Sequence, residues 1–573
     1  MKASAVSAMN RLSTPFVAAT VPFCEYPRPQ LVRDSYLCLN GDWRLSCRRK
    51  GTERTVGTVR VPFPPESTLS GVEKTLSRNE QWIYERTFRL PDGFLKDRLL
   101  LHFGAADQSV RVFLNDREVG EHLGGYTAFT FDVTSAVCAG ENRLRVEVWD
   151  TLSPDLPFGK QRKKRGGMWY TPFSGIWQTV WLESVPNEYI RRVRVTPTLD
   201  SVTVEVEGGA EEKCLILHTE DGATEYRFCG DSITLRVEKP RLWSPESPYL
   251  YDFSLASGTD EVQSYFALRT VSVGKVNGRE RILLNGKPYF FHGLLDQGYF
   301  SDGLVLPASE EGYRFDVKTM KSLGFNTLRK HIKIEPEAFY YACDREGMLV
   351  FQDMVNNGRY SFLRDTALPT LGKKHRSLPR RMSKRRRRMF LETAVATVDQ
   401  LYNHPCVVYY TIFNEGWGQH NPDGVYRCLK AYDRSRVWDA TSGWFFGNES
   451  DVQSEHVYFK PIALTAQRKP LVLSEFGGYS LKLDDHSFNP KRTYGYRRFT
   501  DRDAFNEALA ALYENEVTAA IRGGLCASIL TQVSDVEDEV NGLVTYDRRV
   551  VKADEATMRR LASQLRQTFE ENV

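Results

Sequence analysis

The pattern of apolar residues changes near residue 276, and this change constrains the fold more than any other feature of the chain. Before it, apolar and polar residues alternate in short runs such as 82–90 and 143–150, as in strands with one buried face. After it, runs of β-branched and aromatic residues alternate with longer segments of helical periodicity, such as 311–323. The chain is therefore expected to combine β domains with an α/β domain, and its 573 residues suffice for two to four domains.

Eight strand-like runs follow residue 276, and helical segments separate them. This is the size and rhythm of a (β/α)8 barrel, in which the carboxyl ends of the strands form the catalytic mouth. Helices are expected at 311–323, 335–345, 390–402 and 424–432. Strands are expected at 289–295, 326–331, 348–352, 407–413, 436–440, 455–459, 471–474 and 526–531.

The chain before residue 276 is predicted to form two β-sandwiches. Short alternating runs recur between residues 30 and 185, separated by turns rich in Gly, Asp and Asn. Residues 187–275 continue the pattern over the length of an immunoglobulin domain, and Pro186 marks the boundary. We therefore predict three domains, at 1–186, 187–275 and 276–573.

Two of the predicted barrel strands lead directly into a glutamate. The run Val407–Phe413 is followed by Asn414 and Glu415, and the run Pro470–Ser474 is followed by Glu475. By their order these are strands 4 and 7, whose ends lie on opposite walls of the mouth. Two such carboxyls can act on a glycosidic bond as proton donor and nucleophile. A lone glutamate at a strand end would more often be a solvated loop residue, so the pair carries the prediction.

Bulk composition argues against several other classes of protein. The net charge of +4 offers no global argument for nucleic-acid binding, and no run approaches the roughly 20 apolar residues of a membrane span. The ten cysteines are scattered singly without C-x-x-C spacing, so neither a zinc site nor a disulfide framework is expected. Residues 1–11 lack the apolar core of a signal peptide, so a reduced, cytoplasmic location is expected.

Several strings, in this order, resemble those of glycoside hydrolase family 2, which holds β-galactosidases, β-glucuronidases and β-mannosidases. Residues 166–181 resemble the end of the family's sugar-binding sandwich, 242–251 the close of its immunoglobulin-like domain, and 284–288 the start of its barrel. Asn414-Glu415 and Ser474–Gly478 complete the set. The resemblance covers nearly the whole chain. It implies a jelly-roll sugar-binding domain, an immunoglobulin-like domain and a catalytic TIM barrel.

The resemblance also assigns roles to residues. It implies a retaining exo-β-glycosidase in which Glu415 is the general acid/base and Glu475 the nucleophile, with Asn414 bonding the sugar 2-hydroxyl. Such a pair needs its carboxyls about 5–5.5 Å apart and its nucleophile ionised. Tyr458, ending strand 6, is placed to hydrogen-bond the nucleophile and keep it charged. The other predicted substrate-binding residues are Arg329, His331, Trp444, Asp296, Gln297 and Asp353.

Two departures from the family pattern bear on the sugar. β-Glucuronidases carry an Asn-x-Lys after strand 8 that clamps the substrate carboxylate, and here the stretch 539–542 reads Glu-Val-Asn-Gly. The family's strand-8 tryptophan is also absent from 530–533, which leaves Trp444 or Trp417 as the stacking surface. We therefore expect a galactose-like neutral sugar. A β-glucuronide, another uronic or neutral β-glycoside, and an inactive carbohydrate-binding protein are the alternatives.

The segment 373–388 holds ten Lys or Arg and no acid. It is either a polyanion-binding patch that recruits acidic or sulfated sugars, or a solvated insertion beside an acidic surface or subunit contact, which we prefer. Arginines 385–388 in a first helical turn oppose the helix dipole, so an anionic partner would be favourable there. The expected partner of the chain is a β-glycoside, without nucleic acid, membrane, metal or cofactor. Self-association into a homo-oligomer stays open.

Overall fold

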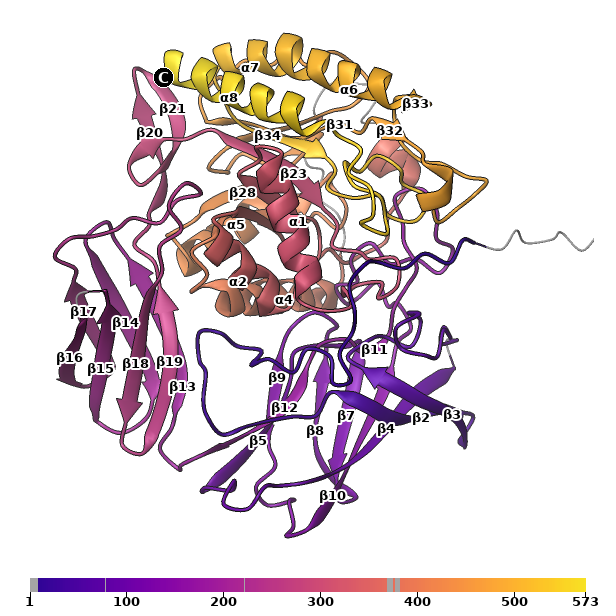
Figure 1. Cartoon of the computed structure of the whole chain (residues 1–573), viewed down its shortest axis with the longest axis vertical. Helices are drawn as coiled ribbons and strands as arrows, with labels where there is room; N and C mark the ends of the chain where they lie inside the picture. The colour runs from indigo at the N-terminus through magenta and orange to yellow at the C-terminus, as the bar shows by residue number, and fades with distance from the viewer. Residues whose placement is uncertain (1–8, 78, 221, 368–374, 377–381) are drawn as a thin grey trace, which may run out of the picture.

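The carboxyl-terminal part of the chain forms a (β/α)8 barrel in the computed structural model (Figure 1). Parallel strands pair in the order β28 (Val437–Ser442), β27 (Val407–Asn414), β25 (Leu349–Asp353), β24 (Thr327–Lys330), β23 (Phe291–Asp296), β34 (Leu525–Thr531), β31 (Leu471–Gly477) and β30 (Gln453–Val457). In all but β30 every residue is buried, because both faces of each strand are covered. All eight predicted strands are present, which confirms the barrel. The structure describes residues 9–77, 79–220, 222–367, 375–376 and 382–573.

Helices surround most of the barrel, and the four predicted ones are confirmed. One begins earlier than residue 390, because Ser383 Oγ accepts a hydrogen bond from the Arg386 N–H and caps it. The prediction of strict alternation is wrong after strand 5: no helix lies between residues 443 and 470, all of which are described. The helices are α1 (Glu311–Ser322), α2 (Glu337–Glu346), α4 (Lys384–Leu401), α5 (Pro422–Tyr432), α6 (Arg502–Ala511), α7 (Thr518–Arg522) and α8 (Glu555–Glu571).

The barrel is open between β28 and β30, since no backbone pairing joins these two described strands. Residues just before β30 take the place of a ladder. The Trp438 N–H donates to Asp451 Oδ2 at 2.9 Å, and the Asp451 N–H returns a bond to the Trp438 carbonyl at 2.9 Å. The Ala440 N–H donates to Ser450 Oγ at 3.2 Å. Backbone groups on the edge of β28 that faces away from β27 are therefore satisfied without a second paired strand.

Two antiparallel sheets form the first sandwich, at the bottom of Figure 1. Their inward side chains, including Trp43, Trp82 and Tyr84, form a separate hydrophobic core. One sheet contains β1 (Tyr36–Cys38), β12 (Val180–Val185), β5 (Arg98–Phe103) and β9 (Phe129–Asp132). The other contains β3 (Thr52–Val61), β2 (Gly41–Arg49), β4 (Glu80–Arg89), β10 (Glu141–Trp149), β7 (Ser109–Leu114) and β8 (Arg117–Leu123). A short pair, β6 (Ala106–Asp107) and β11 (Gly175–Ile176), adjoins them.

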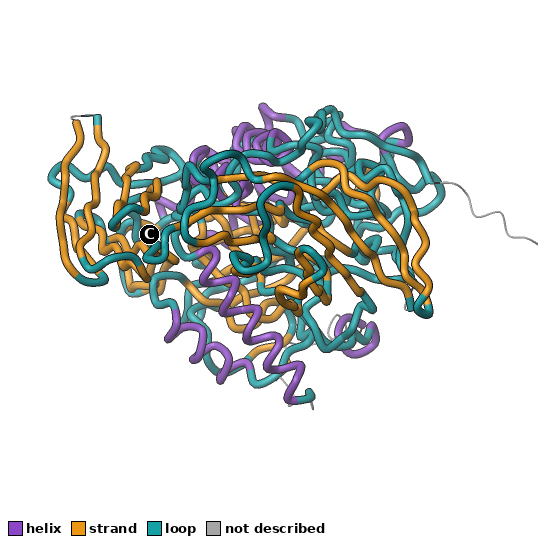
Figure 2. Tube along the Cα trace, turned by 90° about the horizontal axis from the view of Figure 1, so that it is seen from below, coloured by secondary structure: helices purple, strands orange, loops and turns teal. Residues whose placement is uncertain are grey.

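The second sandwich lies at one end of the molecule, on the left in Figures 1 and 2, and consists almost wholly of strands. One sheet contains β13 (Ile190–Pro197), β14 (Ser201–Gly208) and β17 (Ser232–Arg236). The other contains β16 (Gly222–Cys229), β15 (Glu212–Thr219), β18 (Tyr251–Ser257) and β19 (Asp260–Phe266). The sheet of β20 (Val271–Val276), β21 (Arg279–Leu284) and β22 (Lys287–Pro288) leads into the barrel. The predicted domain boundaries at 186 and 275 stay predictions.

A buried ion cluster ties the two sandwiches together. Arg33 donates to Glu183 Oε2 of β12 at 3.1 Å and to Asp260 Oδ1 of β19 at 3.0 Å. Arg28 also pairs with Glu183, and burial opposes ionisation of this carboxyl. The charges of Arg28, His102 and Arg33 outweigh burial and hold the pKa of Glu183 well below its usual range.

No helix in the described part of the chain is long and apolar enough to cross a membrane. All ten cysteines are free. The cytoplasmic location and the homo-oligomer stay predictions.

Candidate active site

Glu415 follows β27 in a strained turn at the barrel mouth. Its backbone is left-handed, with φ of 50°, and its N–H donates to the Ser442 carbonyl at the end of β28 at 3.1 Å. Gly416 continues the turn with φ of 70°, and a Cβ there would lie 2.4 Å from the Phe445 ring. Only glycine fits at 416, so the turn that presents Glu415 is fixed by sequence.

Glu475 lies within β31, which extends to Gly477 instead of ending at Ser474 as predicted. The pairing register of β31 with β34 shifts between Leu473 and Phe476, and its register with β30 also shifts at this level. Such an irregularity re-aims a side chain that regular alternation would direct elsewhere. The bulge therefore presents Glu475 to the mouth.

His456, in β30, lies between the two glutamates. Its Nδ1 donates to Glu415 Oε1 at 2.9 Å and lies 3.6 Å from Glu475 Oε2. Ligand-type atoms of the three side chains all lie within 4.8 Å of one another, so a carboxylate oxygen of Glu415 comes that close to one of Glu475. So close an approach of two carboxylate oxygens is compatible with a retaining pair, whose carboxyl groups lie roughly 5–5.5 Å apart. The same three side chains also form a donor set that a metal ion could use.

Arg329, at the end of β24, connects the walls of the site beneath the two glutamates. The side chain is fully buried, which is tolerated because all of its nitrogens are hydrogen-bonded. Nε donates to Asp353 Oδ1 at 2.9 Å, and Nη1 donates to Glu475 Oε1 at 3.1 Å. Nη2 donates to Asn414 Oδ1 at 2.9 Å. The predicted residues Arg329, Asp353 and Asn414 therefore meet at the predicted nucleophile.

The amide of Asn414 has one orientation in this network. Its Oδ1 accepts hydrogen bonds from Arg329 and, at 2.7 Å, from Ser442 Oγ. The guanidinium of Arg329 can only donate, so the amide oxygen must face it, and Ser442 Oγ, which accepts a bond from Arg329 at 3.2 Å, donates to the same oxygen. The Asn414 Nδ2 group is thereby left as the donor available to a substrate hydroxyl.

Glu475 is held ionised by its surroundings. Burial opposes the charge, but the imidazole of His456, the guanidinium of Arg329 and the Tyr458 hydroxyl together hold the pKa of Glu475 well below its ordinary range. Tyr458 Oη donates to Glu475 Oε2 at 2.6 Å. The expected contact between Tyr458 and this carboxylate is therefore present.

His331 contacts the nucleophile network through Asp353. Its Nδ1 donates to Asp353 Oδ2 at 2.6 Å, and burial lowers the pKa of His331 to about 4. The ring is therefore uncharged near neutral pH, with Nδ1 protonated. Asp353 accepts bonds from both Arg329 and His331 and thereby orients both groups.

Asp296 and Gln297 belong to neighbouring networks. Asp296 accepts hydrogen bonds from Lys330 Nζ at 2.6 Å and from the Gly298 N–H at 2.9 Å, so both of its oxygens are used within the protein. Gln297 Nε2 donates to Gln532 Oε1 at 2.9 Å, just after β34. Both residues lie at the end of β23 as predicted, and Asp296 supports the mouth through its protein contacts.

Of the two tryptophans predicted as stacking surfaces, one lies beside the glutamates and the other is covered by neighbouring side chains. Trp444 lies edge-on to His456 with ring centroids 5.8 Å apart, beside the glutamates. Trp417 is 3% exposed and packs on Phe158 and on Trp169, 5.1 Å away. Trp444 is therefore the better placed of the two predicted stacking surfaces, because Trp417 is covered.

A loop of the first sandwich, residues 158–171, forms one wall of the mouth, a feature that the sequence did not reveal. The Phe158 N–H donates to the Asn356 carbonyl, and Tyr170 Oη donates to Glu539 in the segment after β34. Burial raises the pKa of Glu539. The positive charge of Lys160 lowers this pKa, and the negative charge of Glu475 raises it. Glu539 therefore lies within electrostatic reach of both Lys160 and Glu475.

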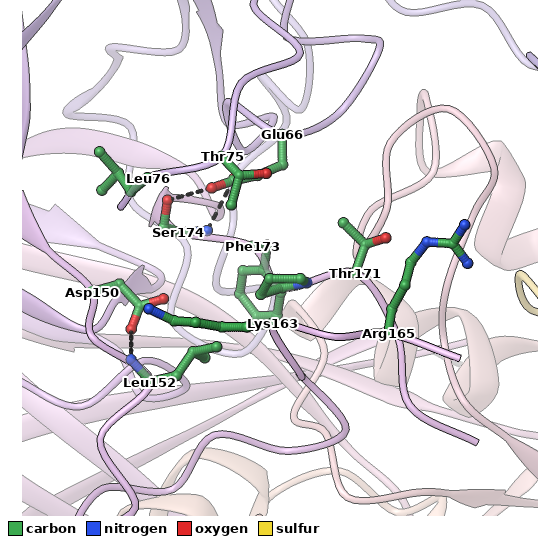
Figure 3. Close-up of a pocket in the computed structure, with 11 residues that line it drawn as sticks. Glu66, Thr75, Leu76, Asp150, Leu152, Lys163, Arg165, Thr171, Phe173 and Ser174 are labelled. Atoms are coloured by element: carbon green, nitrogen blue, oxygen red, sulfur yellow. Dashed lines mark hydrogen bonds between the residues drawn. The ribbon is translucent and has the colours of Figure 1, made fainter. Parts of the chain in front are cut away.

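A polar pocket of about 340 Å³ lies beneath the same loop (Figure 3). Glu66 is held there by Ser174, whose Oγ donates to Oε1 at 2.6 Å, and Asp150 accepts a bond from the Leu152 N–H. Lys163 points towards Asp150 in this view, while Arg165 points away to pair with Asp538 at 3.1 Å. The pocket walls thus join the loop to the segment that carries Glu539.

Paired carboxylates at the ends of barrel strands 4 and 7, behind two β-sandwiches, define a glycoside hydrolase. The chain belongs to glycoside hydrolase family 2. Residues 65–186 match "Glycosyl hydrolases family 2, sugar binding domain", residues 187–269 match "Glycosyl hydrolases family 2", and residues 275–476 match "Glycosyl hydrolases family 2, TIM barrel domain".

Individual relatives bear different names. A β-glucuronidase of Rattus norvegicus is 27% identical over 490 residues, 73% of this chain and 72% of that protein. A β-galactosidase of Aeromonas hydrophila subsp. hydrophila is 27% identical over 504 residues, 78% of this chain but only 45% of the relative's length. The β-D-glucuronidase structure of Dictyoglomus thermophilum shares the fold, with a TM-score of 0.73 at 18% identity over 94% of this chain and 98% of that one.

Three functional groups escaped the sequence reasoning. His456 was included in a predicted strand, but nothing in its neighbourhood distinguishes a site residue from a core residue. Ser442 ends β28, two residues beyond the predicted strand at 436–440, so the strand-end rule did not reach it. Glu539 was noted only as a departure from a family motif, and its contact with Tyr170 joins residues 369 positions apart.

Proposed function

We propose that this protein is a retaining exo-β-glycosidase that works by double displacement, with Glu415 as acid/base and Glu475 as nucleophile. The observation that carries the proposal is the approach of the two carboxylates, within 4.8 Å at the barrel mouth. An inverting pair would need about 6.5–9.5 Å, to admit a water molecule between the substrate and the base.

The environments of the two carboxyls suit these roles. Glu475, kept ionised by its neighbours, attacks the anomeric carbon while protonated Glu415 gives its proton to the leaving oxygen. Water then attacks the glycosyl-enzyme ester, and Glu415 takes a proton from that water, which restores the starting state. Asn414 Nδ2 donates a hydrogen bond to the sugar 2-hydroxyl. Arg329 donates to both Asn414 and Glu475 and so fixes the positions of these two side chains.

For the sugar itself we propose a neutral, galactose-like residue. Glu539 occupies the stretch where β-glucuronidases carry the Asn-x-Lys clamp, and its buried carboxyl would repel a substrate carboxylate but accept a bond from a hydroxyl. A uronide is the second candidate, because the charge of Lys160 acts on both Glu539 and His331. Some relatives are named β-galactosidases and others β-glucuronidases, so the relatives support both candidates.

The test is hydrolysis of p-nitrophenyl β-glycosides: galactoside, glucuronide, mannoside, glucoside, arabinopyranoside and galacturonide. We expect the wild type to release nitrophenol from the galactoside, and Glu475→Gln to lose at least about 10⁴-fold in rate. Glu415→Ala should recover turnover with azide, giving a β-glycosyl azide, because the small anion replaces the water that Glu415 would activate. An α-configured azide product, or full activity in Glu475→Gln, would refute the mechanism.

A further inference from the structure

We infer that the leaving-group side of the active site binds a polyanionic glycan, one bearing carboxylate or sulfate groups, on a rim of basic residues. This inference deepens the proposed function, on which it rests. The rim is defined as the exposed Lys and Arg of three segments: 160–165, 384–388 and 491–498. None of the three segments contains an acidic residue.

The first segment lies in the sandwich loop that forms a wall of the mouth. Arg162 lies over the Trp169 ring, with its guanidinium carbon 5.3 Å from the centroid, and Trp169 in turn packs against Trp417. Lys164 is exposed beside it. Because Trp417 follows Glu415 by two residues, these cations flank the acid/base, which faces the leaving group.

The second segment is the first turn of α4. Asn357 Nδ2 donates to the Arg386 carbonyl at 2.9 Å, and Trp417 Nε1 donates to the neighbouring Gly358 carbonyl at 3.1 Å. Arg386 also pairs with Asp155 of the first sandwich. The turn is therefore anchored to the same edge of the mouth. Arg388 pairs with Glu392 one turn further along the helix, so two arginines of this turn have an acidic neighbour. The preferred interpretation of the basic segment stays a prediction, and its residues 373–374 and 377–381 lie outside the described residues.

The third segment brings cations to the mouth beside the sandwich loop. Tyr496 stacks on Tyr458, the partner of the nucleophile, with centroids 4.1 Å apart. Tyr494 lies against Gly167 of the sandwich loop, whose Cβ position is 3.4 Å from the ring. Lys491, Arg492 and their neighbours therefore complete the rim around the same opening.

Most cations of the rim have no carboxylate neighbour. Within the described chain, ion pairs involve Arg165, Arg386 and Arg388, and Lys163 points towards Asp150, whereas Lys164, Arg385 and Arg387 have no acidic side chain within 4.0 Å. The exposed cations of 491–498 likewise lack such partners among the described residues. Uncompensated like charges converging on one opening repel one another, and a polymer with regularly spaced anions relieves that repulsion.

The occupant must be a polymer or oligomer that continues beyond the mouth. The terminal sugar enters the site with its anomeric carbon at Glu475, so the rest of the chain crosses the rim. Glu539 lies inside, where a neutral sugar fits, while the positive rim lies outside, where the anionic units of the leaving chain would pass. The two regions thus select different parts of one substrate.

The experiment compares the wild type with a rim variant, Lys164→Ser/Arg385→Ser/Arg387→Ser/Arg492→Ser, and with a control variant carrying Ser at Arg54, Arg227, Lys239 and Lys287. All eight positions are exposed, and the control positions lie on the sandwiches and the hairpin before the barrel. Heparin and polygalacturonate, as sulfated and carboxylated probes, would be tested as inhibitors of nitrophenyl glycoside hydrolysis, with neutral dextran as reference. Fluorescent forms of both polyanions would be bound to the Glu475→Gln protein.

We expect competitive inhibition of the wild type by a polyanion but not by dextran. The inhibition constant should rise about tenfold or more in the rim variant at low salt, and the difference should shrink at about 0.2 M NaCl. Equal binding by the rim and control variants would overturn the inference. Tighter binding of single-stranded DNA than of either glycan would replace it with nucleic-acid binding. Nitrophenyl glycoside hydrolysis reports the proposed function separately, and polyanion binding to Glu475→Gln does not require it.

Discussion

Arg329 Nη1 donates to Glu475 Oε1 at 3.1 Å. The proposed nucleophile on β31 is therefore held by a side chain from β24, and the strands β23 and β34 lie between these two in the barrel. The same guanidinium holds the Asn414 amide oxygen. One buried cation thereby sets both the charge of the nucleophile and the direction in which the neighbouring amide donates.

Asn414→Ala should lower kcat/KM for the 2-hydroxyl glycoside by about 10²-fold, because its Nδ2 donor bonds a hydroxyl whose interaction strengthens in the transition state. On the corresponding 2-deoxy glycoside the same substitution should cost little, since the partner is missing. The measurement is kcat/KM for both enzymes on both substrates. Equal losses on the two substrates would assign Asn414 a purely structural role.

Tyr458→Phe should move the acid limb of the pH profile upwards. The wild-type Glu475 pKa lies below its usual range, so the nucleophile stays ionised to low pH and activity falls only as pH drops through that lowered pKa. Loss of the 2.6 Å hydrogen bond removes a donor to the ionised form, which raises the pKa by about one unit. The readout is kcat/KM against pH. Tyr496→Phe, which removes a hydroxyl from the ring stacked on Tyr458, serves as control and should leave the acid limb in place.

His456→Leu should reduce kcat by about 10–100-fold with little change in KM, because Glu415 loses the donor that positions its carboxylate. His456→Asn should recover much of this loss, since an asparagine amide nitrogen can replace the donor at Nδ1. The informative comparison is the rate of each step, from single-turnover and steady-state kinetics with a dinitrophenyl glycoside. If Leu and Asn variants behave alike, the hydrogen bond to Glu415 has no role.

Glu183→Gln should destabilise the pair of sandwiches by about 3–5 kcal/mol at pH 7, since Arg28 and Arg33 lose their shared buried partner. The folded pKa of Glu183 is lowered, so its contribution is present above the unfolded value, near 4.3, and is lost as pH falls towards the folded one. The difference between variant and wild type should therefore narrow from pH 7 to about pH 3.

Urea unfolding followed by tryptophan fluorescence at both pH values measures this difference. Glu118→Gln, which breaks an exposed pair with Arg111, is the matched control and should leave the stability essentially unchanged at both pH values. A Glu183→Gln penalty that does not change with pH would show that packing, not charge, accounts for the loss.

Local pattern was sufficient for the architecture. The strand before Glu415 and the strand carrying Glu475 were predictable because buried parallel strands are continuous runs of β-favouring residues. The order of those strands predicts that both glutamates lie at one mouth, since a barrel brings all carboxyl ends to one face. Tyr458 and Arg329 followed from the same rule.

Elsewhere local pattern was insufficient. The expected alternation of strands and helices fails between residues 443 and 470, where extended chain bonds to β28 because the Ser450 and Asp451 side chains satisfy its backbone. The end of β31 was placed too early, since its bulge depends on two neighbouring strands at once. Neither feature has a local signal.

The sequence by itself determined the fold family and the two glutamates, because periodicity and strand-end position are properties of short segments. Only the tertiary structure decided that His456 lies between those glutamates, that a loop of the first sandwich reaches the mouth, and that Glu539 contacts Tyr170. These contacts join residues far apart along the chain, and their geometry depends on how three separate cores pack together. No segment of the sequence contains that information alone.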